Sequence, residues 1–169
     1  MDAIAILLRF LHIGAGITWV GSAFFVLAVL DPMAVRIGAV EAHRIHRHLV
    51  LRSKFGALFP IAGITTVVAG FVLYWRVHAQ DAWPMSTSAG IVFHVGVLFG
   101  VLALVWGGAM EGRLLGKVRK LSTAMEGGKP TAAQETEFTG LVHRLSNANK
   151  VSGVLLVIAM FGMATFQYF

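Results

Sequence analysis

The chain contains no cysteine and few charged residues, and both shortages narrow what it can be. Without cysteine it forms no disulfide, holds no iron–sulfur cluster through thiolates and attaches no haem covalently, so histidine is the expected metal ligand. Charged residues make up 13% of the 169 residues, against about 25% in soluble domains, and hydrophobic residues make up 57%. The composition therefore predicts an integral membrane protein.

Four apolar segments are long enough to cross a bilayer as helices, because a hydrocarbon core of about 30 Å requires about 20 helical residues. The third helix is expected to begin after Pro84. The first segment is not expected to be a cleaved signal peptide, since its apolar region is too long and no A-x-A-like site closes it. We predict an all-α, four-transmembrane-helix bundle that forms a single membrane domain, residues 1–169, with spans at about 5–30, 55–76, 86–111 and 150–168.

Basic residues gather in the two connections that share one side of these spans. The opposite side carries only Arg9 and Arg76. By the positive-inside rule we expect a protein of the bacterial inner membrane with both termini outside the cytoplasm. The net charge of +6 then indicates orientation in the bilayer rather than nucleic-acid binding. The basic residues of the two cytoplasmic connections are Arg36, Arg44, Arg47, Arg52 and Lys54, and Arg113, Lys117, Arg119, Lys120, Lys129, Arg144 and Lys150.

The two cytoplasmic connections are both expected to contain helix. The first carries His43, His46 and His48 and is typical of a basic surface helix against anionic headgroups; a metal held by the first two of these histidines is the alternative. In the second, apolar stripes flank a Gly-Gly-Lys-Pro break, and Thr131 with Gln134 has the signature of a capping box. The third and fourth helices are therefore predicted to extend into the cytoplasm as a helical hairpin.

Two histidines lie inside apolar spans, and ionisable groups at membrane depth indicate function. His12 and His94 are each expected about 10–15 Å below the outer surface, at 1.5 Å per helical residue. Their surroundings, Leu-His-Ile-Gly and Phe-His-Val-Gly, are similar and are consistent with a diverged two-helix repeat. On neighbouring parallel helices, the two imidazoles are candidate axial ligands of one haem b. The alternatives are another metal arrangement and histidines that only bond between helices.

Other residues of the outer half fit the haem interpretation. Gly16 and Trp19 continue the helical face of His12, where a flat ligand could lie. Arg9 and Arg76 are candidate partners for the two propionates, although boundary arginines also extend to headgroups. His78, just beyond the second span, is a candidate replacement ligand.

Glycine stripes mark close contacts between helices. The second span carries Gly56, Gly63 and Gly70 at seven-residue spacing, and the third carries Gly96 and Gly100. Small residues at such spacing favour helix packing in lipid, while a cofactor face is the alternative. No span interior is expected to contain a carboxylate beyond Asp31, which argues against a carboxylate proton relay.

The first span resembles known membrane families. Leu-Arg-Phe-Leu-His at 8–12, Gly-Ile-Thr-Trp-Val-Gly at 16–21 and Asp31 are similar to the first helix of the membrane region of bacterial urate oxidases of the PuuD type, of copper-resistance D-like proteins and of membrane-type protoporphyrinogen oxidases. The resemblance implies a four-helix membrane unit with His12 as an axial haem ligand. The chain is expected to depart from both enzymes. No cytochrome c domain is expected after the bundle, and the third helix has no convincing counterpart of the lysine of the protoporphyrinogen oxidases, although His94 stands nearby.

The sequence thus favours a b-type cytochrome-like protein, an electron-transfer or oxidoreductase component that acts alone, as a homo-oligomer or within a respiratory complex. A quinone or a redox protein is the expected partner. Two alternatives remain: a copper or other metal transporter whose path includes Met85, and a haem-free scaffold subunit.

Overall fold

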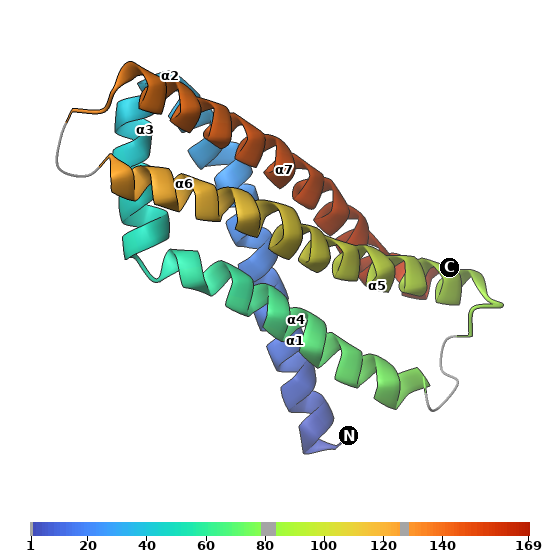
Figure 1. Ribbon diagram of the computed structural model, residues 1–169. Helices are drawn as coiled ribbons and strands as arrows, with labels where there is room; N and C mark the ends of the chain where they lie inside the picture. The colour runs from blue at the N-terminus through green and yellow to red at the C-terminus, as the bar shows by residue number, and fades with distance from the viewer. Residues whose placement is uncertain (1, 79–83, 126–128) are drawn as a thin grey trace.

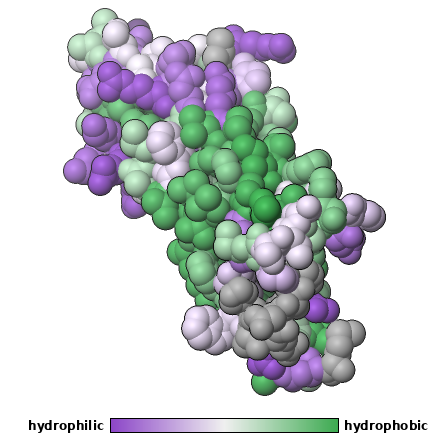
Figure 2. Space-filling view, turned by 90° about the vertical axis from the view of Figure 1, so that its right-hand side faces the viewer, coloured by the Kyte–Doolittle hydropathy of each residue, from purple (hydrophilic) through white to green (hydrophobic). Residues whose placement is uncertain are grey.

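The computed structural model describes residues 2–78, 84–125 and 129–169, and within these ranges every regular element is helical. Four helices are long and apolar enough to cross a membrane, which confirms the predicted fold class. Figure 2 shows a broad apolar band with hydrophilic residues gathered above it. The elements are α1 (Ala3–Phe25), η1 (Val26–Leu30), α2 (Asp31–Ile37), α3 (Ala39–His46), η2 (Arg47–Arg52), α4 (Phe55–His78), α5 (Ser88–Trp106), η3 (Gly107–Glu111), α6 (Gly112–Ala124), α7 (Ala132–Thr165) and η4 (Phe166–Tyr168).

The helices begin where the sequence supplies caps. The Asp2 side chain accepts a hydrogen bond from the Ile4 backbone N–H at the start of α1, and Thr87 does the same for Gly90 at the start of α5. Both caps satisfy amide groups that the first helical turn leaves without partners. Two π-helical turns, η1 and η3, then join α1 to α2 and α5 to α6 without interrupting the helices.

The four spans pack as two pairs, and this pairing differs from the expected one. α1 packs along α4, and α5 packs along α7, with smaller contacts from α1 to α7 and from α4 to α5. In Figure 1 the two pairs converge at the end that carries α3 and diverge toward the end that carries both termini. The sequence analysis expected the first and third spans to be neighbours. In the structure each packs mainly against a different span, and the two lie diagonally opposite in the four-helix arrangement.

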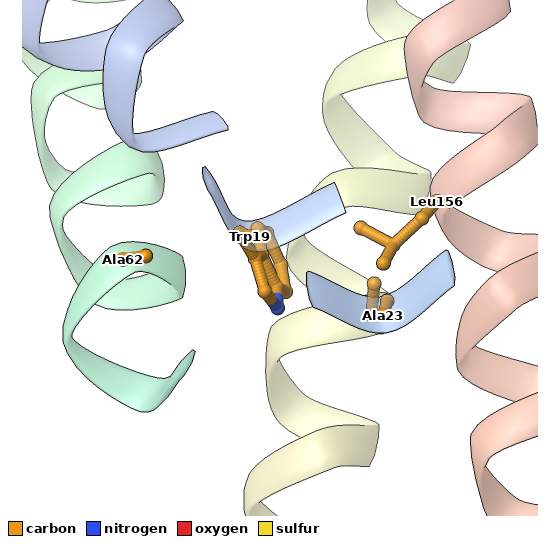
Figure 3. Packing of buried hydrophobic residues seen from close by; sticks show 5 residues of the cluster. Trp19, Ala23, Ala62 and Leu156 are labelled. Carbon is orange, nitrogen blue, oxygen red and sulfur yellow. The ribbon is translucent and has the colours of Figure 1, made fainter. Parts of the chain in front are cut away.

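One hydrophobic cluster joins all four spans near the middle of the bundle. It contains Trp19 and Ala23 of α1, Ala62 of α4, Ala103 of α5 and Leu156 of α7. Trp19 is 5% exposed, and Figure 3 shows it between the α4 and α7 members of the cluster. Small residues on three of the four helices leave room for the indole, which therefore fills the centre of the bundle.

The predicted helical hairpin beyond the apolar layer is present. α6 packs against the N-terminal part of α7 through a second cluster of buried residues, Val118, Met125, Phe138 and Leu141. The expected capping box forms, because Thr131 accepts from the Gln134 backbone while the Gln134 side chain accepts from the Thr131 backbone. The fourth helix accordingly begins at Ala132, about five turns before the membrane span predicted at 150–168, as expected for a helix that extends into the hairpin.

Candidate functional site

The contact between α1 and α4 is built from three matched positions in antiparallel register. His12 lies against Gly70, Gly16 against Thr66 and Trp19 against Gly63. A Cβ built on Gly70 would come within 2.7 Å of the His12 Nδ1 atom, and one on Gly63 within 3.0 Å of the Trp19 ring. Gly63 and Gly70 of α4 are seven residues apart, as are His12 and Trp19 of α1. Each of these two glycines is therefore in contact with one aromatic ring of α1.

His12 is held by the backbone of α4. Its Nδ1 atom lies 2.8 Å from the carbonyl oxygen of Thr66, and the side chain is half-buried. A carbonyl only accepts, so the Nδ1 atom carries the proton and donates it. In a neutral imidazole this bond leaves the lone pair on Nε2, which is the form that ligates a metal.

His94 has the same proton arrangement by a different contact. Its Nδ1 atom donates to the carbonyl oxygen of Gly90, 2.6 Å away and one turn earlier on α5. Its Nε2 atom lies 2.9 Å from the Tyr74 hydroxyl of α4, which donates to it. Tyr74 also stacks on Phe93, with ring centroids 6.0 Å apart. Both histidines thus bond to carbonyls through Nδ1.

The two rings reach the same stretch of α4. His12 touches Gly70, and His94 bonds to Tyr74, positions that are about 6 Å apart along a helix axis at 1.5 Å per residue. Helical side chains generally lean toward the N-terminus of their helix, so we expect the Tyr74 hydroxyl to lie closer to the level of Gly70 than the Tyr74 backbone does. α4, which the sequence treated only as a packing helix, thus contacts both candidate ligands.

The arginines expected near the propionates have different surroundings. Arg76 forms an ion pair with Asp2, the residue that caps α1, and so ties the end of α4 to the beginning of α1. Arg9 is exposed on α1, three residues before His12. Gly16 faces the Thr66 methyl group at 3.5 Å and leaves no open ligand face there, and Trp19 belongs to the central cluster.

The structure describes only some of the remaining candidate ligands. Among the described residues no three histidine or acidic side chains come together as a metal site. The side chains of His43, His46 and His78 lie outside the described residues, while His48 is exposed. Met85, which the transport alternative placed on a metal path, is 63% exposed.

The glycines of α5 confirm the packing interpretation. A Cβ on Gly96 would meet the backbone of α7 at 3.0 Å, and one on Gly162 would meet the Gly96 backbone at 2.8 Å. Gly100 faces Ala159 of α7 at 3.8 Å. These positions therefore bring the α5 and α7 backbones together and leave no room for a cofactor between them.

A cavity of about 330 Å³ opens on the other side of Trp19, toward the basic connections. All four spans contribute walls, and neither His12 nor His94 lines it. The sequence analysis did not predict this cavity. Pro60 of α4 also lines the cavity. Because proline has no backbone N–H, it cannot donate to the Gly56 carbonyl, and the helical hydrogen bonding of α4 is interrupted at the cavity wall.

Two carboxyl groups, Asp31 and Glu111, line this cavity. The sequence analysis expected no carboxylate inside a span other than Asp31, and that prediction is wrong. Asp31 continues directly from η1, and Glu111 ends η3 inside the unbroken helix from Ser88 to Ala124. Glu111 is 9% exposed and accepts a hydrogen bond from Ser152 of α7. No local sequence pattern indicated this, because Glu111 is placed inside the helix by η3 and bonds to a residue 41 positions away in the chain.

Comparison with known proteins does not assign this site. No family model, no curated protein and no solved structure matches the chain. The functional argument therefore depends on the residues and their geometry.

Proposed function

We propose that the protein is a membrane b-type cytochrome-like protein that binds one haem b through His12 and His94 and transfers electrons. One observation carries the proposal: both Nδ1 atoms donate to backbone carbonyls, at 2.8 and 2.6 Å, so both Nε2 atoms hold the lone pair. Metal-ligating histidines have this outer bond, which fixes the tautomer and orients the ring.

The donor set fits a haem more closely than a bare metal ion. Two imidazoles are a sufficient axial pair for haem iron, whereas the described residues offer no third histidine or carboxylate at this level. Haem supplies one-electron chemistry when it is bound. The chain contributes the two nitrogen donors, a low-dielectric setting among apolar spans, and Arg9 and Arg76 at the outer end as propionate partners.

Tyr74 adds a condition to this proposal. Its hydroxyl donates to the His94 Nε2 atom, which is the atom proposed to bind iron. Tyr74 therefore has to turn away when His94 ligates, and its stacking on Phe93 limits where it can go. In the haem-free protein this hydrogen bond keeps the His94 lone pair satisfied at membrane depth.

The setting of the activity is part of the proposal. We infer a bacterial inner membrane with both termini outside the cytoplasm, because Arg113, Lys117, Arg119 and Lys120 of α6 put positive charge on the opposite side. The histidines then lie in the outer half of the bundle. The expected electron partner is a quinone or a redox protein, and the chain acts alone, as a homo-oligomer or as a subunit of a larger complex.

The test is an optical spectrum of the purified protein, first oxidised and then reduced. We expect a sharp reduced α-band in the wild type and its loss in both His12→Ala and His94→Ala, since each removes one of two axial donors. His143→Ala is the matched control, because this histidine is exposed on α7 and forms a hydrogen bond with the nearby Asn147 side chain. Its spectrum should equal that of the wild type.

Three results would contradict the proposal. A colourless wild type that retains stoichiometric copper would favour metal transport, and a colourless one without metal would favour a scaffold. An α-band that survives unchanged in either histidine variant would remove that residue from the ligand pair.

A further inference from the structure

The cavity beyond Trp19 is a second site, separate from the histidines. Its volume of about 330 Å³ is within the usual range for small-molecule pockets, and its walls are mostly apolar. Aromatic rings of Trp19, Phe55 and Phe59 form part of the lining. The carboxyl groups Asp31 and Glu111 are close enough to interact electrostatically, and Ser152 bonds to Glu111. A pocket of this kind accommodates an organic molecule with an apolar body and one polar end.

The charged residues that the structure describes on the cavity wall are both acidic. They are Asp31 and Glu111, and no lysine, arginine or histidine is among the described lining residues. This contrasts with the net charge of +6 and with the basic residues that surround this end of the bundle. Lys150 interacts electrostatically with Asp31, but it is exposed and lies outside the lining. The cavity is therefore an acidic pocket within a basic surface.

The carboxyl groups have acceptor capacity left over. The Asp31 Oδ2 atom is buried and has no hydrogen-bond partner among the described residues, although Ser146 and Asn149 lie near the side chain. Glu111 accepts from Ser152. Buried polar atoms are nearly always paired, so an open acceptor at a cavity wall indicates a missing donor. An ammonium group supplies donors and a compensating positive charge.

The helices that carry these carboxyl groups are locally rewound to present them. Asp31 directly follows the π-helical turn η1, and Glu111 is the last residue of η3. A π-helical turn inserts one extra residue and so rotates the following side chains onto a different face. Such turns are frequent at functional sites, and here the first and third spans each use one at the same end of the bundle.

We propose that this cavity binds a monovalent organic cation, an apolar molecule that carries one protonated amine. The amine lies between Asp31 and Glu111, and the apolar body extends along the cavity toward Phe59 and Trp19. The aromatic faces add cation–π attraction for any part of the charge that reaches them. This site does not depend on haem binding, because the two sites share no residue.

The experiment compares two probes that differ only in charge. Isothermal titration calorimetry of the wild-type protein in a non-ionic detergent uses 4-phenylbutylamine, which is protonated at neutral pH, and 4-phenylbutanol. We expect saturable binding of the amine and binding of the alcohol weaker by about tenfold or more, since a desolvated ion pair contributes more than a neutral hydrogen bond. Partition into detergent micelles is measured with protein-free micelles and subtracted.

Matched variants then locate the site. The double variant Asp31→Asn, Glu111→Gln keeps the shape of both side chains and removes their charge, so we expect it to lose the preference for the amine. The control Glu135→Gln, Glu137→Gln changes the same number of charges on the cytoplasmic part of α7, away from the cavity, and should bind as the wild type does.

The amine and alcohol binding equally well in the wild type would overturn the proposal, and this comparison needs no variant. Unchanged amine binding in the cavity double variant would also overturn the proposal. An equal loss of amine preference in the Glu135→Gln, Glu137→Gln control would do the same. Circular dichroism of the cavity variant confirms that the helices remain. An absent haem spectrum would refute the proposed function without affecting this result.

Discussion

At the scale of single residues, the site depends on how rings fit against glycine. His12 rests on Gly70 and bonds to Thr66, and two turns further on Trp19 rests on Gly63. The absence of a Cβ lets each ring approach the α4 backbone closely. The same contacts fix the antiparallel register of α1 and α4, because a shift of either helix would bring a ring against a larger residue.

Gly70→Ala is expected to destabilise the protein. The new Cβ would lie 2.7 Å from the His12 Nδ1 atom, so the imidazole has to move and its bond to Thr66 is lost. We expect a loss of about 1–3 kcal/mol, the usual cost of overpacking, measured as the free energy of unfolding in mixed detergent micelles.

Gly14→Ala is the control for this change, because nothing lies within 4 Å of a Cβ at that position on α1. It should leave stability unchanged or raise it by up to about 1 kcal/mol, as alanine favours helix over glycine. Equal destabilisation by both variants would show that the contact with His12 is not the cause.

The candidate ligands could be predicted from the sequence, whereas the acidic cavity could not. His12 and His94 are conspicuous because a titratable residue inside an apolar span is rare. Glu111 sits at the edge of its apolar stretch and looks like the first loop residue. Its burial depends on η3 and on Ser152, which is 41 residues away in the chain, and no local pattern encodes either.

At the scale of elements, the hairpin of α6 and the N-terminal part of α7 has a small hydrophobic core of its own. Its cluster of Val118, Met125, Phe138 and Leu141 is separate from the one around Trp19. Its stripes are readable in the sequence because water, unlike lipid, forces an amphipathic pattern on a helix. The capping box of Thr131 and Gln134 then fixes where α7 begins.

Phe138→Ala is expected to loosen this hairpin and leave the spans intact. Phe138 is 1% exposed, and truncation of a buried phenylalanine costs about 3–5 kcal/mol. Trypsin should therefore cut at the basic residues of α6 at least about tenfold faster, since cleavage follows the population of the opened hairpin.

Phe161→Ala serves as the matched control on the same helix. Phe161 is 59% exposed within the apolar part of α7, and its removal should not change cleavage of α6. Faster cleavage in both variants would indicate that the whole helix, and not the hairpin cluster, had been weakened.

At the scale of the whole molecule, the number of spans could be predicted from the sequence and their arrangement could not. Length and composition are enough to count four apolar helices. The pairing of α1 with α4 and of α5 with α7 depends on small residues that touch across helices, such as Gly96 with Gly162. In lipid all faces of a span are apolar, so hydrophobic periodicity does not reveal which face is buried.

The proposed orientation can be tested directly, because the chain has no cysteine of its own. We expect Met85→Cys, in the connection before α5, to react with a membrane-impermeant maleimide in spheroplasts, as Met85 is 63% exposed. Thr139→Cys, on the exposed side of the hairpin, should react only after lysis. The reverse pattern would invert the topology and place the histidines near the cytoplasm.

The closure of all four spans around Trp19 also bears on permeability. The indole and its apolar neighbours form a constriction between the half of the bundle that holds the histidines and the half that holds the cavity. A narrow apolar constriction excludes water and therefore blocks hydrated ions. A bilayer that contains this protein should therefore remain impermeable to ions, and a molecule that enters the bundle from one side of the constriction should leave on the same side.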